Sequence, residues 1–304
     1  TATTLSRYGW QAEQYDRILE HATATEYCRD FLELCRQKKM EVVLIELFGG
    51  GTKWLLSRVH IFQDLIVKLR QENPAIKVGG IMVDVHGERE KIALDNFADY
   101  LDVLWSHLIY PVPVYNNPTF AKKVLRAFIP YCDGNVGTPD RPLIPQLLFD
   151  ATVHAGSWSR VFWMHASDRL RLPVTTNINK FSYSDPLYQS SPLSDYERYM
   201  RRLGDATCCL VYSDFSVHGR SFEVPLMGSL LVHEEALGMR GYFIPGEHFL
   251  EFSSIAELAS LVRFITEHRE EAEEIRRAGN SYARERYNDH RLVAELDRFL
   301  FFPD

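Results

Sequence analysis

The stretch GRSFEVPLMGSLLVHEE, residues 219–235, indicates the fold most directly, because a short helix, a glycine and a strand follow one another in it. Residues 219–227 have the pattern of a short helix, Gly228 interrupts the apolar run, and 229–232 (SLLV) predict a strand. Just upstream, 206–212 (ATCCLVY) is another apolar run of strand type. The order strand, helix, strand is typical of a parallel sheet in an α/β protein.

The same alternation of apolar runs and helical patterns extends along most of the chain. Runs rich in β-branched and aromatic residues predict further strands at 41–48, 76–83, 100–107, 126–132 and 160–166. We therefore predict an α/β chain made of two Rossmann-like domains that face each other across a cleft.

A segment rich in proline and glycine, 133–146 (DGNVGTPDRPLIPQ), predicts the linker between the two domains. The predicted boundaries are 1–140 for the N-terminal domain and 141–288 for the C-terminal domain. The last helix, 289–304, can cross back to the N-terminal domain.

Composition narrows the class of protein. The chain has 304 residues, of which 46% are hydrophobic and 25% charged, as in ordinary soluble domains. A net charge of −7 argues against a broad nucleic-acid footprint. The five cysteines show no metal-ligand spacing, so we expect buried thiols in a reducing compartment. No run approaches the ~18 apolar residues of a membrane span and no signal peptide is visible, so a cytoplasmic location is expected.

Two helices are predicted after the strand at 229–232. Ser254 and Glu257 have the spacing of a capping box, and an apolar stripe at helical spacing follows them. The charged run 267–279 (EHREEAEEIRRAG) predicts an exposed helix face that ends at Gly279 as its C-cap.

Ligands of open α/β sheets bind beyond the carboxyl ends of the strands, which directs attention to the start of the 219–227 helix. A helix start presents free N–H groups that suit a phosphate. Arg220 adds a fork of donors that can grip a diphosphate, and Glu223, one turn on, is an acceptor suited to the two hydroxyls of a ribose. The alternative is an ordinary i, i+3 ion pair on a helix surface.

Residues 219–235, together with YFIPGEHFLEFSSIAEL and the C-terminal helices, resemble the C-terminal domain of GT-B glycosyltransferases. The resemblance covers 160–304 and is closest to the group 1 branch that contains the spore-maturation CgeB-like proteins. That branch carries Arg-x-Phe-Glu followed five residues later by Gly, matched here by Arg220, Phe222, Glu223 and Gly228. The resemblance implies that Glu223 holds the ribose of a nucleotide-sugar donor. The other donor-segment residues that it implies are Gly219, Arg220, Ser221 and Phe222.

The chain departs from this family at several positions. Many retaining members carry a second Glu eight residues before the ribose-binding one; here Phe215 stands there, and its neighbour Asp214 is the candidate substitute. The usual Arg…Lys pair is absent at its common spacing, and Arg169 and Lys180 are the candidates for that role. The family's opening strand and glycine-bearing loop are not visible in residues 1–40. Either the chain is truncated or its acceptor domain is reduced and built differently.

Other loops at predicted strand ends offer candidates for the acceptor side. Asp84 and His86 end a strand, and one of them could orient or deprotonate an acceptor hydroxyl; the alternative is a structural turn, which is favoured for Asp84. His165 ends the predicted strand 160–166, at the rim where a donor sugar would lie. Glu234 and Glu235 are interpreted as a solvated pair. A glycine run that precedes a helix lets the backbone approach a ligand or simply makes a tight turn, and it comprises Gly49, Gly50 and Gly51.

These observations predict a glycosyltransferase that moves a sugar from a nucleoside-diphosphate sugar, such as a UDP-sugar, to an acceptor hydroxyl. The resemblance implies a retaining reaction without a metal or other obligatory cofactor, in which Arg220 and helix amides stabilise the departing diphosphate. The acceptor is a small molecule, a glycan, a protein or a modified nucleic-acid base. Two alternatives stay open: a GT-B relative that epimerises or hydrolyses a nucleotide sugar, and a non-catalytic module that only binds one.

Overall fold

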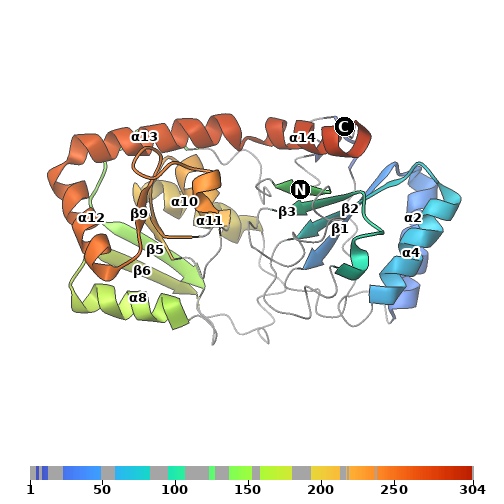
Figure 1. The fold of residues 1–304 in the computed structure, drawn as a ribbon, viewed down its shortest axis with the longest axis horizontal. Helices are drawn as coiled ribbons and strands as arrows, with labels where there is room; N and C mark the ends of the chain where they lie inside the picture. The colour runs from blue at the N-terminus through green and yellow to red at the C-terminus, as the bar shows by residue number, and fades with distance from the viewer. Residues whose placement is uncertain are drawn as a thin grey trace. The chain divides into compact units, whose positions relative to one another are not determined.

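The computed structural model describes most of the chain and divides it into two compact units (Figure 1). Unit 1 comprises Thr1–Pro130 and Asp289–Asp304, and unit 2 comprises Tyr131–Asn288. Among the described residues, no helix is both long enough and apolar enough to cross a membrane. The described residues are 5–6, 9–12, 23–48, 59–82, 95–106, 123–126, 137–152, 158–179, 193–212, 217, 219–236 and 238–302.

Unit 1 is built on a parallel sheet in which the strands lie in the order β1-β2-β3-β4. Two helices, α2 and α4, lie side by side next to this sheet (Figure 1). A capping box starts α2, because Thr23 and Glu26 each bond to the other's backbone N–H. The elements are α2 (Ala24–Lys38), β1 (Val42–Phe48), α4 (Val59–Glu72), β2 (Lys77–Met82), β3 (Val103–Ser106), β4 (Val124–Arg126) and α14 (Asp289–Phe301).

The core of unit 1 forms where alternate strand residues meet the apolar faces of α2 and α4. Val78 and Leu104 point to this side of the sheet and pack in one cluster with Leu32 of α2 and Ile66 of α4. The last helix, α14, also belongs to unit 1 and contacts β4. The indole N–H of Trp10 donates a hydrogen bond to the Asp297 carboxylate of α14, with 3.0 Å between the two atoms.

Unit 2 is a five-stranded parallel sheet with the strand order β6-β5-β7-β8-β9. Its helix α8 lies on one side of the sheet and α10 and α11 lie on the other (Figure 1). The elements are β5 (Leu147–Thr152), α8 (Trp158–Arg169), β6 (Val174–Asn179), α10 (Leu193–Asp205), β7 (Cys208–Val211), α11 (Gly219–Leu226), β8 (Leu230–Glu234), η2 (Met239–Gly241), β9 (Leu250–Phe252), α12 (Ile255–Glu267) and α13 (Arg269–Arg286).

Strand β7 shows how the sheet of unit 2 is buried on both faces. Its four residues are all buried, and successive side chains point to opposite faces. Cys208 and Leu210 join the cluster that contains Trp163 of α8 and Leu258 of α12. The Cys209 thiol instead contacts a backbone carbonyl of α10. The expectation of buried thiols is confirmed for the described cysteines, which are free and buried: Cys28, Cys35, Cys208 and Cys209.

The strand predicted at 160–166 is wrong, because these residues lie within helix α8. Their burial has helical spacing: Trp163 and Ser167, one turn apart, are buried, whereas Phe162 and His165 are exposed. A short apolar run does not distinguish a strand from a helix that has one buried face.

The first strand of unit 2, β5, was not predicted, and a buried acid explains why. Asp150 interrupts its apolar run LLFDAT, yet only 5% of the residue is exposed. Arg202 of α10 donates a hydrogen bond of 2.8 Å to the Asp150 carboxylate, which satisfies the buried charge.

Helix α13 does not end at Gly279 as predicted but continues to Arg286. Gly279 is required there for a different reason. A Cβ atom at this position would lie 2.2 Å from the His248 carbonyl oxygen, so only glycine lets the helix approach that loop. Gly228, expected only to interrupt the apolar run, is the residue that caps a helix: it follows α11 with φ 76°. Hydrogen bonds from Gly228 to the Pro225 carbonyl and from Ser229 to the Val224 carbonyl complete a Schellman motif.

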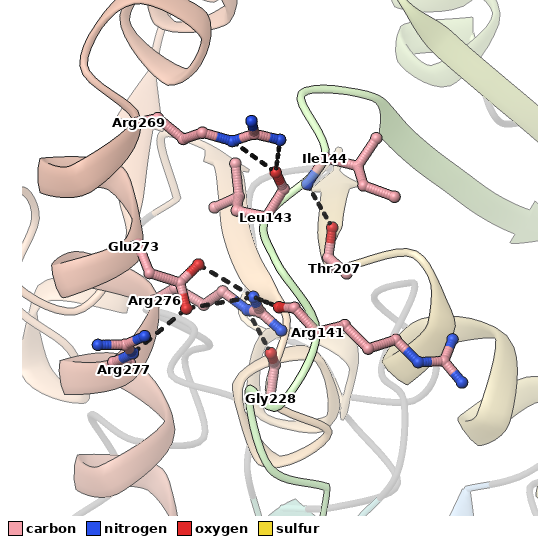
Figure 2. Close-up of polar contacts among 9 residues, drawn as sticks. All are labelled: Arg141, Leu143, Ile144, Thr207, Gly228, Arg269, Glu273, Arg276 and Arg277. Atoms are coloured by element: carbon pink, nitrogen blue, oxygen red, sulfur yellow. Dashed lines mark hydrogen bonds and ion pairs between the residues drawn. The ribbon is translucent and has the colours of Figure 1, made fainter.

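The charged run of α13 is not wholly exposed, because Arg276 is only 1% exposed. Figure 2 shows its guanidinium pointing from α13 to carbonyl groups of two other segments. It donates to the Gly228 carbonyl at 2.6 Å and to the Arg141 carbonyl at 2.7 Å. Glu273, one turn earlier, supplies the countercharge at 3.0 Å. The guanidinium is therefore hydrogen-bonded and paired, as a buried charge has to be.

Two further α13 side chains fix the segment that precedes β5. Arg269 donates to the Leu143 carbonyl, as Figure 2 also shows, and Asn280 donates to the Gly137 carbonyl at 3.2 Å. The second half of the predicted linker, from Gly137 onward, is thus held by hydrogen bonds to α13. We call residues 137–144 the strap of unit 2.

Candidate functional site

The strand order of unit 2 places a topological switch point between β5 and β7. From β5 the chain crosses over to β6 on one side, and from β7 it crosses over to β8 on the other. Open α/β sheets bind ligands outside the carboxyl ends of the strands at such a point. Helix α11 is the first helix after the carboxyl end of β7, so Gly219 and Arg220 start it at this edge of the sheet.

Helix α11 is packed tightly into unit 2. All its residues from Ser221 to Leu226 are buried. The ring of Phe222 is fully buried and packs edge-on against Tyr242 at 4.9 Å and Tyr287 at 5.0 Å between ring centroids. The first turn of α11 is therefore anchored by a packed aromatic cluster.

Glu223 is buried, with only 4% of the residue exposed, and the structure gives it a partner that the sequence did not suggest. The hydroxyl of Tyr199 on α10 donates a hydrogen bond of 2.8 Å to its Oε2 atom. The Arg220 guanidinium lies over the Tyr199 ring, with 6.0 Å from its Cζ atom to the ring centroid. Burial first, and then the Glu223 carboxylate, raises the pKa of the Tyr199 hydroxyl well above its usual value. Arg220 and Glu223, which were predicted as a pair, thus both contact Tyr199.

Ser221 and His233 form a second buried contact that fixes the first turn of α11 to β8. The Ser221 hydroxyl lies 2.8 Å from Nε2 of His233, and Nδ1 of His233 contacts the Glu234 carbonyl. A neutral imidazole satisfies both partners when Nδ1–H donates to the carbonyl and Nε2 accepts from the hydroxyl. Burial lowers the pKa of His233 to about 4, although the Glu234 carbonyl opposes this effect.

This buried histidine predicts that stability falls in mild acid. The pKa of His233 is about 4 in the folded chain and 6.5 in a free side chain. Above pH 6.5 neither state binds the proton, so stability is unaffected; below it the unfolded chain gains a proton that the folded chain resists. The loss between pH 7 and pH 5 is about 2 kcal/mol. Urea unfolding at both values should show a loss smaller by that amount in His233→Gln; an equal loss in both proteins would contradict this assignment.

The structure separates some predicted donor residues from this edge of the sheet. His165 is exposed in the middle of α8 and does not end a strand. Arg169 is the last residue of α8, shortly before β6 begins, and therefore lies near the amino ends of the strands. Lys180 follows the last residue of β6 in the sequence, but it lies outside the described residues. The same holds for Asp214, Asp84, His86, Gly49, Gly50 and Gly51.

The interpretation of Glu234 and Glu235 as a solvated pair holds only for Glu235, which is exposed. Glu234 is partly buried and accepts a hydrogen bond of 2.8 Å from the indole N–H of Trp163. Sequence spacing gives no signal for this contact, because 71 residues separate the two partners. Across the described ranges, no three His, Cys, Asp or Glu side chains gather as a metal site would require.

Comparison with known proteins adds sequence evidence for unit 2. Residues 160–300 match a family model described as glycosyl transferase-like. This match contains α11 with Arg220, Glu223 and their partner Tyr199. No match to a curated protein was found.

Solved structures show the fold of the chain. It is similar to HepE from Anabaena in complex with UDP and glucose, with TM-score 0.64 and 11% identity over 98% of this chain and 88% of that chain. It is also similar to sucrose-phosphate synthase from Thermosynechococcus elongatus, with TM-score 0.55 and 14% identity over 91% of this chain and 78% of that chain. For TarM the TM-score is 0.57 at 10% identity over 89% of this chain and 57% of that chain, so this chain spans less than two thirds of TarM. The predicted fold class is thereby confirmed: the chain has the α/β, Rossmann-like fold of GT-B glycosyltransferases, and its residues 160–300 are glycosyl transferase-like in sequence.

Proposed function

We propose that this protein is a glycosyltransferase that takes a sugar from a nucleoside-diphosphate sugar and passes it to an acceptor hydroxyl. The donor would bind to unit 2 at the start of α11. The observation that carries the proposal is the buried Glu223 carboxylate at the switch point, with Arg220 one turn away at the helix start. An exposed i, i+3 ion pair would not require a buried carboxylate, whereas a ribose site uses one as a fixed acceptor of two hydroxyl hydrogen bonds.

The chemistry follows from what a departing diphosphate needs. Negative charge builds on its oxygens as the bond to the sugar breaks, and it can be stabilised by the α11 amides and the Arg220 guanidinium. We propose that this stabilisation needs no divalent metal and that transfer retains the anomeric configuration. Lys180 and Asp214 remain candidates on the donor side, and Asp84 and His86 remain candidates for orienting the acceptor hydroxyl.

One experiment tests donor binding and turnover together. Thermal unfolding is followed with a panel of UDP-, GDP-, ADP- and dTDP-sugars, and selective stabilisation names the donor by mass action. UDP-glucose is the first member, because HepE was solved with UDP and glucose. Turnover of the selected donor is then measured with EDTA and an acceptor panel, and NMR reads the anomeric configuration of the product. We expect transfer that persists in EDTA.

Several outcomes would overturn this proposal. No stabilisation by any member of the panel would remove the donor site. Rapid conversion of the donor without an acceptor would favour an epimerase or hydrolase, and saturable binding without a product would favour a binding module. An inverted product, or loss of turnover in EDTA, would refute the retaining or metal-independent part alone.

A further inference from the structure

We propose that Tyr199 is the positioning residue that sets the Glu223 carboxylate for the ribose diol and thereby makes the site select nucleotides with 2′- and 3′-hydroxyls. This inference rests on the proposed function. The juxtaposition that carries it is the Tyr199 hydroxyl 2.8 Å from Oε2 of Glu223, with Arg220 over the face of the same ring.

The hydrogen bond restricts the rotation of the carboxylate. A glutamate side chain has several rotatable bonds, and ordering it when a ligand binds costs free energy. The hydrogen bond from the Tyr199 hydroxyl orders the Glu223 side chain before a ligand binds, so binding loses less conformational entropy. A carboxylate offers about four lone-pair sites, so an acceptor role toward Tyr199 leaves capacity for two ribose hydroxyls.

Helix α10 is a firm support for this tyrosine. Met200 and Leu203, which follow Tyr199 on the same helix, are buried. Arg202 of this helix pairs with the buried Asp150 carboxylate of β5 at 2.8 Å. The helix that carries Tyr199 is therefore tied to β5, one of the two strands at the switch point. Because the pKa of its hydroxyl is raised, Tyr199 stays protonated and remains a donor throughout the neutral range.

The same ring supports Arg220, which gives the tyrosine a second role in the donor site. A guanidinium that lies against an aromatic face keeps its planar fork of donors free at the edges. The hydroxyl contact and the ring contact thus fix the groups proposed for the two ends of the nucleoside diphosphate. Arg220 also interacts electrostatically with the Tyr199 hydroxyl. Loss of the hydroxyl should therefore disturb the ribose end more than the diphosphate end, where the ring contact to Arg220 is kept.

The test compares nucleotides with and without the ribose diol. Isothermal titration measures UDP, GDP and their 2′,3′-dideoxy analogues against the wild type, Tyr199→Phe and Tyr212→Phe. We expect Tyr199→Phe to weaken the diol nucleotide about 10-fold and the dideoxy analogue less than about 3-fold. Tyr212→Phe is the matched control, since its buried hydroxyl contacts Ser167 on the other side of the sheet, and it should change neither affinity.

The outcomes separate the inference from the proposed function. If the wild type binds none of the nucleotides, the proposed function fails and this inference fails with it. If the wild type prefers the diol and Tyr199→Phe keeps the full preference, or weakens both analogues equally, the positioning role is refuted. Tyr199→Gln, which keeps a donor group, is the second variant should the phenylalanine variant fold poorly. Because its amide can partly replace the hydroxyl as donor, this variant should keep part of the wild-type preference for the diol nucleotide over the dideoxy analogue, and equal weakening of both nucleotides would count against the proposal.

Discussion

Replacing Glu223 with Gln is expected to weaken binding of the nucleotide-sugar donor about 100-fold while the fold stays intact. Two hydrogen bonds from ribose hydroxyls to a buried carboxylate contribute about 3 kcal/mol, and a neutral amide makes them weaker and in part misdirected. The amide oxygen can still accept the hydrogen bond from Tyr199, so the packing of α11 on α10 is retained. Titration of the donor identified by the panel measures the loss directly.

The control for this substitution is Glu267→Gln, an exposed change at the end of α12. It removes the same charge and should leave donor affinity unchanged. Thermal unfolding without ligand should give nearly equal midpoints for both variants. Normal donor affinity in Glu223→Gln would show that the carboxylate is only a structural partner of Tyr199, and the donor site would have to lie elsewhere.

Replacing Arg276 with Met is expected to destabilise unit 2 by about 3–5 kcal/mol, the largest effect on stability that the structure predicts. Methionine fills a similar volume but donates no hydrogen bond. The carbonyl groups of Gly228 and Arg141 would lose their buried donor, and Glu273 would lose a partner at 3.0 Å. Calorimetry, which resolves separate transitions in a chain of two units, is the measurement of choice.

Arg277→Ala is the matched control, because the neighbouring residue pairs with the same Glu273 at 3.3 Å but is 66% exposed. Its loss should cost less than about 1 kcal/mol, the range of surface ion pairs. If both variants unfold alike, the buried hydrogen bonds of Arg276 make no special contribution and the strap is held by other contacts.

The segment from 206 to 235 shows how far the sequence could lead. Its strand, short helix, glycine interruption and second strand are all present, because the local periodicity agrees with the tertiary structure. Arg220 and Glu223 were identified from the sequence because two charged residues stand out within an otherwise apolar segment. The burial of Glu223 then supports the functional interpretation over an exposed ion pair.

Tertiary contacts decided what the sequence could not show. Tyr199 lies on an amphipathic helix with nothing unusual around it, and only packing brings its hydroxyl to Glu223. Arg276 looked like one charge in an exposed run, yet its carbonyl partners are 48 and 135 residues away in the chain. The same limit explains β5, where Asp150 concealed a buried strand until Arg202 was seen to pair with it.

The hydrogen bonds between α13 and the strap also define where unit 2 can be cut. An excised unit that began at β5 would retain every strand of its sheet but leave behind the carbonyl groups of Gly137, Arg141 and Leu143. Three side chains of α13 would then lose the hydrogen bonds that they donate to these carbonyl groups: those of Asn280, Arg276 and Arg269. A fragment of unit 2 designed to fold on its own should therefore start before Gly137, even though the sheet itself starts ten residues later.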